Sequence, residues 1–396
     1  MSEQVIAPRF RGFIGLTTHP EGCAASVRRQ LQVVRERCPG SGLGTILVIG
    51  SSTGYGLGSL LTGVFGYGAK GLGVCFERPP KDPKTGSPGW YNLAEAQVQA
   101  SAEGRQLETI VGDAFSNEIK EQTITALKER FGPIDCVVYS LAAPKRLDPS
   151  NGTLYSSVLK PVGSSYTGKS IDLRDYSIGE VTIDPASEDE ILATQKVMGG
   201  EDWQIWMERL ADVGLLAPGC RTVAYSYIGP EVTYPIYRSG TIGKAKEHLE
   251  ATAQHLDSVL QKHCQGNAWV SVNKALVTQA SSAIPVVPLY ISLLFKVMKE
   301  KGTHEGTIEQ AVRLFNDHLA PDKSPTLDSE GRIRLDDREM DPAVQQAVAE
   351  LWKQVNSDNL TQLADLDGYQ SDFHALFGFG LPEVDYSQAT EVDRPV

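Results

Sequence analysis

Apolar runs of strand length alternate with amphipathic stretches over the first 145 residues. Four runs qualify as buried strands, at 45–49 (TILVI), 71–76 (GLGVCF), 107–111 (LETIV) and 135–140 (DCVVYS). Before the fourth run, apolar residues recur at helical spacing after Ser116, whose hydroxyl can cap a helix. Strands that alternate with helices form parallel sheets through right-handed crossovers. The pattern therefore predicts an α/β fold with a doubly wound parallel sheet.

The pattern changes after residue 147. Residues 147–184 hold short polar and β-like pieces rich in glycine, serine and tyrosine, which indicates an insertion over the sheet. The sequence Ser187–Glu190 (SEDE) is typical of a capping box and opens a helix predicted to run through residue 197. Further strands are predicted at 222–227 and 268–272, and further helices at 241–260 and 342–355.

No internal repeat or low-complexity linker divides the chain. A chain of 396 residues can bury roughly three quarters of its unfolded surface. We therefore expect one elaborated domain over residues 1–396. Its core strands fall in about 45–145 and 220–280, its covering insertion in about 147–215, and a C-terminal helical extension in about 283–396.

Composition and charge argue against several classes of partner. The net charge is -12 and the pI is near 5.2. With no block of lysine and arginine in the sequence, this charge speaks against nucleic-acid binding. The six cysteines are scattered, with no C-x-x-C pair and no histidine at metal-ligand spacing. We therefore expect neither a metal site nor a disulfide framework.

No stretch of the chain is predicted to span a membrane. The first 20 residues lack an apolar block of signal-peptide length, so a cytoplasmic location is the default expectation. The longest apolar run, 283–295 (AIPVVPLYISLLF), is too short to cross a bilayer and contains Pro285 and Pro288. This run is interpreted either as the wall of an apolar ligand pocket or as core packing.

A glycine-rich turn follows the first predicted strand and precedes a helix. It reads Gly50, Ser51, Ser52, Thr53, Gly54, Tyr55, Gly56. In this context a glycine turn brings backbone N–H groups and a helix N-terminus up to a pyrophosphate. The spacing G-x-x-x-G-x-G is typical of the short-chain dehydrogenase version of the dinucleotide fold.

Polar residues end the next three predicted strands. Glu77 can accept hydrogen bonds from the adenosine ribose and repel a 2′-phosphate, which favours NADH over NADPH. Arg78 complicates this preference, because a guanidinium can hold that phosphate, and Glu77 can also be read as a solvated loop carboxylate. Asp113 is placed to meet the adenine amine, and the residues 140–143 (SLAA) lie beside the nicotinamide half. Together these strand ends predict a dinucleotide site.

The segment 224–246 (AYSYIGPEVTYPIYRSGTIGKAK) combines tyrosines with lysines. A tyrosine hydroxyl near a lysine ammonium is expected to have a lowered pKa and to serve as a proton donor. Tyr237 is followed by Lys244 at seven positions and by Lys246 at nine. A serine or threonine cap in Ser239–Thr241 predicts a helix start, which leaves Tyr237 on the preceding loop and Lys246 in the second turn. The alternative is that all three are ordinary surface residues.

Several sequence blocks together resemble one known family, the NADH-dependent trans-2-enoyl-CoA reductases and their FabV-type enoyl-ACP reductase relatives. The blocks extend over nearly the whole chain. They are GSSTGYG at 50–56, SPGWYN at 87–92, GDAF at 112–115, VVYSLAAPKR at 137–146, KVMGGEDW at 196–203, AYSYIGPE at 224–231, YRSGTIGKAK at 237–246 and VTQASSAIPVVPLY at 277–290.

This resemblance implies a single Rossmann-type domain with a substrate-covering portion, and an NADH-dependent enzyme that reduces trans-2-enoyl-CoA or enoyl-acyl-carrier-protein in fatty acid synthesis. It implies that Tyr237 is the proton donor, Lys246 the ribose-binding lysine and Tyr227 the substrate-binding tyrosine, in a monomer. The implied cofactor residues are Gly50, Ser51, Ser52, Thr53, Gly54, Tyr55, Gly56, Phe76, Glu77, Asp113, Ala114, Leu141, Ala142, Lys246, Leu276, Val277 and Thr278.

Two other functions remain open on the residues alone. A carbonyl reductase acting on a ketone or a 3-oxoacyl thioester would use the same tyrosine and lysine. A non-catalytic protein that senses dinucleotides would share the glycine turn, although it has no need of Tyr237 and Lys246. Acyl chain length and the choice of carrier are not visible in the sequence.

Overall fold

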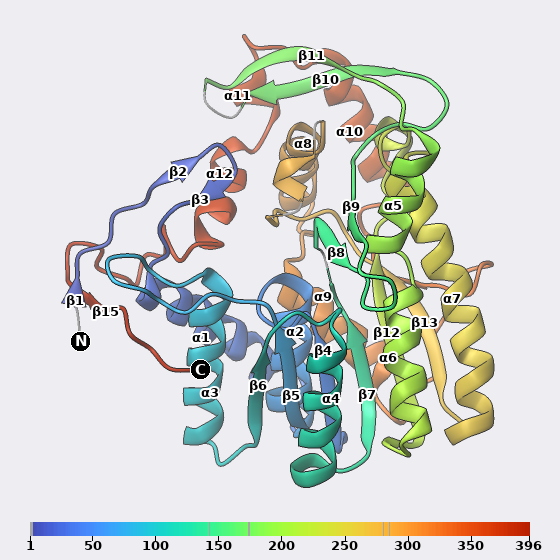
Figure 1. The fold of residues 1–396 in the computed structure, drawn as a ribbon. Coiled ribbons are helices and arrows are strands. Elements are labelled where there is room, and N and C mark those ends of the chain that lie inside the picture. Colours follow the sequence, from blue (N-terminus) through green and yellow to red (C-terminus); the bar gives the residue numbers. More distant parts are fainter. Residues whose placement is uncertain (1–2, 142, 173–174, 280, 285) are drawn as a thin grey trace.

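A seven-stranded parallel sheet forms the centre of the computed structural model, which describes residues 3–141, 143–172, 175–279, 281–284 and 286–396. The strand order is β14-β13-β12-β7-β4-β5-β6, and each neighbouring pair runs parallel (Figure 1). The strands are β4 (Thr45–Ile49), β5 (Lys70–Cys75), β6 (Leu107–Val111), β7 (Ile134–Tyr139), β12 (Leu216–Ser226), β13 (Asn267–Val272) and β14 (Ile333–Arg334). The six predicted strands are confirmed. No prediction covered β14, because two residues carry no periodic signal.

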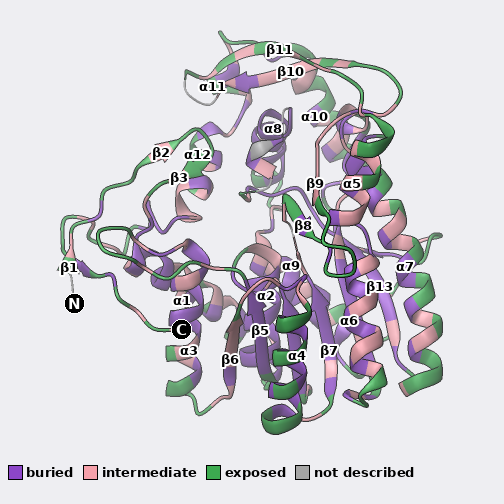
Figure 2. Ribbon diagram, viewed as in Figure 1, coloured by how far each residue is buried: buried purple, intermediate pink, exposed green. Residues whose placement is uncertain are grey.

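Helices cover both faces of this sheet. Successive residues of a strand point to opposite faces, and in β4 Ile46 and Val48 pack into one buried cluster while Leu47 and Ile49 pack into another. The first cluster includes α1 (Pro20–Arg37), α2 (Gly54–Leu61), α3 (Pro88–Ala102) and α9 (Thr307–Leu314). The second includes α4 (Asn117–Ala126), α6 (Glu201–Asp212) and α7 (Thr241–Cys264). Figure 2 shows the central strands β4, β5 and β7 as mostly buried, whereas the edge strand β6 is mostly intermediate. The predicted doubly wound, Rossmann-type architecture is confirmed.

Two of the three predicted helix caps are present. The Ser116 hydroxyl accepts a hydrogen bond from the Ile119 N–H at the start of α4. Ser187 and Glu190 form the predicted capping box of α5 (Glu188–Met198). The hydroxyl cap predicted for α7 is wrong: Gly240 is the N-cap residue without a side-chain hydrogen bond, and the Thr241 hydroxyl instead donates to the Val158 carbonyl at 2.5 Å. The helix nevertheless begins where the sequence predicted.

The insertion after residue 147 forms two small antiparallel pairs. One pairs β8 (Lys145–Leu147) with β9 (Leu154–Ser156), and the other pairs β10 (Tyr166–Asp172) with β11 (Ser177–Ile183). The β10–β11 hairpin lies beyond α8, on the far side from the sheet (Figure 1). The covering portion is shorter than the expected range of 147–215, because α6 packs against the sheet with α4 and α7.

A third buried cluster lies over the carboxyl ends of the strands. It joins α8 (Val287–Glu300) to α10 (Pro342–Gln354), α11 (Leu360–Leu363) and α12 (Leu366–Ala375). The apolar run 283–295 lies mostly in α8, whose buried residues occupy all sides of the helix. No helix in the described part of the chain is long and apolar enough to cross a membrane.

Short elements complete the chain. Near its two ends β1 (Glu3–Gln4) pairs with β15 (Thr390–Glu391), and β2 (Phe10–Arg11) pairs with β3 (Ile14–Gly15). Single helical turns are η1 (Thr62–Gly66), η2 (Leu127–Phe131), η3 (Glu231–Thr233), η4 (Ser281–Ala283) and η5 (Phe315–Leu319).

Candidate active site

A cavity of about 740 Å³ opens at the carboxyl ends of the central strands. The loops after β4, β5, β6, β7, β12 and β13 all contribute to its wall. Doubly wound sheets bind ligands at this edge, where the strand order reverses. The order reverses here between β4 and β7. Among the described residues, no group of histidine, cysteine, aspartate or glutamate could hold a metal ion.

Most of the predicted site residues line this cavity. Ser51, Gly56 and Val277 do not line it, and Ala142 lies outside the described residues. The predicted residues that line the cavity are Gly50, Ser52, Thr53, Gly54, Tyr55, Phe76, Glu77, Asp113, Ala114, Leu141, Tyr227, Tyr237, Lys246, Leu276 and Thr278.

The glycine turn leaves a helix N-terminus open to the cavity. Gly50 has a φ of 89°, a conformation that favours glycine. A Cβ atom on Gly56 would lie 1.8 Å from the Gly50 carbonyl oxygen, so only glycine lets the turn close. Thr53 caps α2 without a side-chain hydrogen bond. The first N–H groups of α2 thus remain available to an anion such as a pyrophosphate.

Glu77 is held at the cavity wall by its neighbours. Its Oε1 atom accepts a hydrogen bond from the Ser52 hydroxyl at 2.6 Å. A Cβ atom on Gly89 would lie 2.2 Å from the same oxygen. Glycine at this position therefore lets the first turn of α3 pack directly against the Glu77 carboxylate. Arg78 is exposed and does not line the cavity. This arrangement presents a carboxylate rather than a guanidinium to the cavity, as a ribose site requires.

A buried ion pair supports the loop that carries Asp113 and Ala114. The Lys120 ammonium donates to the carbonyls of Ala114 and Phe115 at 2.8 and 3.0 Å, and to Asp202 at 2.7 Å. Burial lowers the pKa of Lys120 and raises that of Asp202. The sequence showed no sign of this pair, because its members lie 82 positions apart.

Tyr237 and Lys246 both reach the cavity, as predicted. Lys246 is partly buried and its ammonium donates to the Tyr225 carbonyl at 2.8 Å. Burial lowers the pKa of Lys246 to about 8. Lys244, in contrast, pairs with Glu247 on the surface at 2.9 Å and does not line the cavity. The structure therefore selects Lys246 from the two lysines.

The expected lowering of the pKa of Tyr237 is wrong for this structure. Burial instead raises the pKa of Tyr237, because the charged phenolate is disfavoured away from water. The hydroxyl has no hydrogen-bond partner in the part of the chain that the structure describes. It therefore stays protonated and is free to donate to a ligand.

Tyr227 lies against Tyr237. Their rings meet edge to face, with centroids 4.8 Å apart. The Tyr227 hydroxyl hydrogen-bonds to Glu339 at 3.0 Å. The remaining tyrosines of the segment pack as expected: Tyr225 contacts the Tyr55 ring and the Ser59 hydroxyl, and Tyr234 packs against the second cluster.

The sequence reading missed several polar residues at the cavity. Ser226 is the last residue of β12 and Asn273 follows β13, and their side chains are 5% and 2% exposed. The Ser226 Oγ and Asn273 Nδ2 atoms have no hydrogen-bond partner among the residues that the structure describes, which indicates that a ligand or water completes them. Lys274 is also buried, and burial lowers its pKa to about 8. Because Ser226 lies near the end of the predicted strand 222–227, and Asn273 and Lys274 follow the predicted strand 268–272, the strand-end rule could have found them. Glu339, 112 positions from Tyr227, left no such signal.

The apolar run 283–295 forms part of the pocket wall and also part of the core, the two interpretations that the sequence left open. Ile284, Val287 and Ile291 line the cavity. Leu289, Leu293 and Phe295 are fully buried in the third cluster. One side of α8 therefore forms an apolar wall, and the other sides are core.

Comparison with known proteins finds relatives over almost the whole chain. Residues 5–82 match the family model of the NAD(P)H binding domain of trans-2-enoyl-CoA reductase, and residues 84–320 match that of the trans-2-enoyl-CoA reductase catalytic region. A trans-2-enoyl-CoA reductase (NADH) of Clostridium perfringens is 51% identical over 98% of this chain and 99% of its own. An enoyl-[acyl-carrier-protein] reductase (NADH) of Opitutus terrae is 51% identical over 99% of this chain and 100% of its own. The crystal structure of Treponema denticola trans-2-enoyl-CoA reductase in complex with NAD, 47% identical, has a TM-score of 0.93 over 99% of both chains.

Residues 327–390 match a third model, described as the enoyl reductase FAD binding domain. None of the described residues in this range lines the large cavity. Helices α10 and α12 instead bury their apolar faces against α8. A second cavity of about 500 Å³ is lined by Asp337, Arg338 and Asp341, with Val344 as its one apolar side chain among the described residues. It offers no apolar face for a flavin ring, so these residues do not fit FAD.

Proposed function

This chain belongs to the trans-2-enoyl-CoA reductase family and is an NADH-dependent enoyl-thioester reductase, and we propose that Tyr237, Tyr227 and Lys246 carry its reaction. NADH, when bound, supplies a hydride for the β-carbon of the enoyl thioester. Negative charge then develops on the thioester oxygen and must be stabilised. The product is the saturated acyl thioester of fatty acid synthesis.

The observation that carries the assignment is that the two tyrosines meet in a cavity that Lys246 also lines. Tyr237 has a free hydroxyl and a ring in contact with that of Tyr227. We assign it as the proton donor, with Tyr227 as a second hydrogen-bond donor to the thioester oxygen. Such preorganised donors are worth several kcal/mol to a transition state. Lys246, with a pKa of about 8, is mainly charged at neutral pH, and its charge favours the Tyr237 phenolate that remains.

The cofactor assignment follows the strand ends. The glycine turn with Gly50 and Gly54 is assigned to the pyrophosphate, Ser52 with Glu77 to the adenosine ribose, and Asp113 with Ala114 to the adenine. The nicotinamide half is assigned to Leu141, Leu276, Val277 and Thr278, with Lys246 on its ribose. The acyl chain is assigned to the apolar wall of Ile284, Val287 and Ile291.

Replacing one hydroxyl tests the assignment. We expect Tyr237→Phe to lose at least about 100-fold in kcat, because it removes the proton donor, while the Kd for NADH stays within about twofold. The assay follows NADH consumption with crotonyl-CoA, and Tyr234→Phe is the matched control. Full activity of Tyr237→Phe would contradict the assignment. Acetoacetyl-CoA in the same assay reports any carbonyl reduction.

We further propose that residues 1–396 act as one domain and as a monomer. All the residues assigned to the reaction come from a single chain, so the site needs no second copy. A cytoplasmic location stays a prediction from the sequence. The carrier of the enoyl group, CoA or acyl carrier protein, is open to direct comparison of the two substrates.

A further inference from the structure

The side chain of Glu339 lies directly behind Tyr227. It is 0% exposed. Its Oε1 atom is 3.0 Å from the Tyr227 hydroxyl and 2.6 Å from the Tyr290 hydroxyl, and its Oε2 atom accepts from the Ala275 N–H at 2.7 Å. Burying a carboxyl group is costly even when it is hydrogen-bonded. Its position behind a residue assigned to the reaction therefore calls for a functional explanation.

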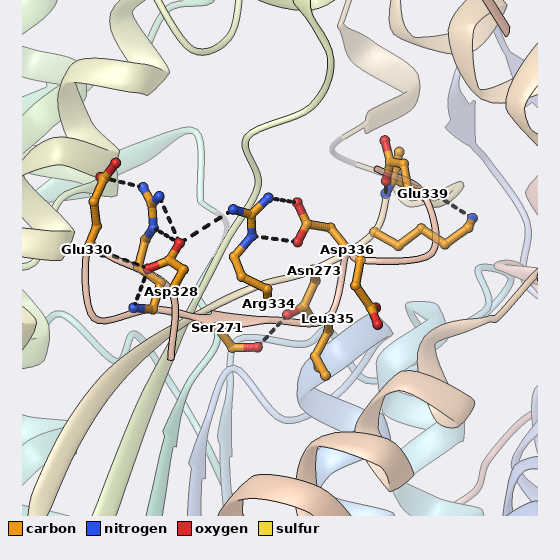
Figure 3. A network of polar contacts seen from close by, with 12 residues as sticks. Ser271, Asn273, Asp328, Glu330, Arg334, Leu335, Asp336 and Glu339 are labelled. Carbon is orange, nitrogen blue, oxygen red and sulfur yellow. Dashed lines mark hydrogen bonds and ion pairs between the residues drawn. The ribbon is translucent and has the colours of Figure 1, made fainter. Parts of the chain in front are cut away.

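The segment after β14 holds Glu339 in place. Figure 3 shows Arg334 between Asp328 and Asp336, with Glu339 farther along the same segment. Arg334 binds both carboxylate oxygens of Asp336 at 2.7 Å. The backbone carbonyl of Glu339 accepts a hydrogen bond from the Gln345 amide at 2.7 Å. The range 327–390 thus contributes the Glu339 side chain to the site. This segment is anchored by β14, the edge strand that pairs with β13.

The Tyr227 hydroxyl has a single hydrogen to donate. When Glu339 is ionised it can only accept, so the hydrogens of Tyr227 and Tyr290 both point to Oε1. Tyr227 then presents only lone pairs to the cavity and cannot stabilise negative charge there. When Glu339 carries a proton it can donate to the Tyr227 oxygen. The hydrogen of Tyr227 is then free to turn toward the cavity.

We propose that Glu339 is a positioning residue of the reduction, which in its protonated form donates to the Tyr227 oxygen and so directs the Tyr227 hydrogen to the substrate thioester. This proposal rests on the proposed function. No bond to hydrogen is broken in the reorientation: the carboxyl proton stays on Glu339 and the hydroxyl proton on Tyr227. Glu339 touches neither substrate nor cofactor and acts through Tyr227 alone.

The surroundings of Glu339 shift its pKa upward. Burial raises the pKa of Glu339, whereas the Lys274 ammonium and the hydrogen bonds from the Tyr290 hydroxyl and the Ala275 N–H oppose this rise. The titratable groups that face it are Tyr227 after β12, Lys274 after β13, Tyr290 on α8, Tyr55 on α2 and Asp336 on its own segment. The active form is the protonated one, so kcat is expected to fall as the pH rises through the pKa of Glu339.

The variant Glu339→Gln tests the proposal. A glutamine amide donates to the tyrosine oxygens at every pH while its carbonyl accepts from Ala275. We expect kcat with crotonyl-CoA within about threefold of the wild-type plateau at low pH, and loss of the part of the high-pH decline that comes from Glu339, while any decline from Lys246 remains. Glu305→Gln is the matched control: Glu305 is 5% exposed, pairs with Arg313 and lies outside the cavity wall. It should keep the wild-type profile. An unchanged decline in Glu339→Gln would overturn the proposal.

A double-mutant cycle with Tyr227→Phe separates positioning from mere structural support. Because Glu339 acts through the Tyr227 hydroxyl, Glu339→Gln should leave the pH profile of Tyr227→Phe unchanged. The same change in both backgrounds would contradict the proposal.

Tyr290→Phe gives an independent readout if Glu339→Gln does not fold. This variant removes one hydrogen-bond donor to the Glu339 carboxylate and so raises the pKa of Glu339. The decline in kcat should therefore move to higher pH, and a decline at the wild-type pH would contradict the proposed role of Glu339. Wild-type protein that does not reduce crotonyl-CoA with NADH would instead remove the proposed function itself.

Discussion

Glu77 combines two features that bear on the choice of cofactor. Its carboxylate lines the cavity and accepts the Ser52 hydroxyl, while the neighbouring Arg78 is exposed and lines none of it. A carboxylate at the adenosine ribose accepts hydrogen bonds from its hydroxyls and repels a 2′-phosphate. The complication that Arg78 posed in the sequence is therefore reduced by the structure, because the two side chains occupy different environments.

Neutralising Glu77 should weaken the preference for NADH. We expect Glu77→Gln to lower the ratio of kcat/KM for NADH over NADPH by roughly tenfold, equivalent to about 1.4 kcal/mol, because one like charge near the 2′-phosphate is removed. Steady-state kinetics with both cofactors measure this ratio. Arg78→Gln is the control and should keep the ratio within about twofold. A larger change in the control would show that Arg78 contacts the phosphate.

The loop after β6 depends on two helices that are far apart in the sequence. Lys120 lies on α4 and Asp202 lies on α6. Their side chains are only 1% and 2% exposed, respectively. Lys120 holds the carbonyls of Ala114 and Phe115, and Asp202 also accepts the Tyr139 hydroxyl at 3.1 Å. Ala114 and Tyr139 both line the cavity. The ion pair thus links the packing of two helices to the shape of the proposed adenine site.

Breaking this ion pair should affect both stability and binding. We expect Lys120→Met to lower the stability by about 3–5 kcal/mol, because the charge of Asp202 is left buried without its partner. The loop at Asp113–Phe115 should loosen and the Kd for NADH should rise. Thermal unfolding and cofactor titration measure the two effects. The double variant Lys120→Met/Asp202→Asn should be more stable than Lys120→Met, and a less stable double variant would contradict this explanation.

Seen as a whole molecule, the chain closes its site with segments from both ends of the sequence. The glycine turn lies near residue 50, the tyrosines and Lys246 lie in the middle, and Glu339 comes from the C-terminal part. The glycine turn follows β4, Tyr227 follows β12, Lys246 lies on α7, and Glu339 follows the edge strand β14. The third cluster then covers the carboxyl ends of the strands with α8 and its neighbours.

This arrangement predicts a self-sufficient monomer. We expect light scattering to give a single species of 43.0 kDa, since no assigned residue is supplied by a second copy. The specific activity should be independent of protein concentration over at least about 100-fold dilution. A larger species whose activity falls on dilution would show that the site depends on a partner subunit.

The local pattern of residues was sufficient for six of the seven strands of the sheet, the glycine turn and two helix caps, and it left Lys244 and Lys246 as alternative partners of Tyr237. These features depend on residues within a few helical turns or a single strand, so the spacing of side chains is enough to predict them. The sequence blocks were also specific enough to indicate the family, and the comparisons confirm it.

Other features required the folded molecule. The raised pKa of Tyr237 comes from burial, and this side chain packs against the third cluster as well as against Tyr227. The Lys120–Asp202 pair, the contact of Glu339 with Tyr227 and the docking of β14 all join positions more than 50 residues apart. Desolvation and long-range hydrogen bonds depend on which elements pack together. The local spacing of apolar and polar residues does not determine this packing. The sequence thus predicts the reacting groups, whereas the tertiary structure sets their protonation and orientation.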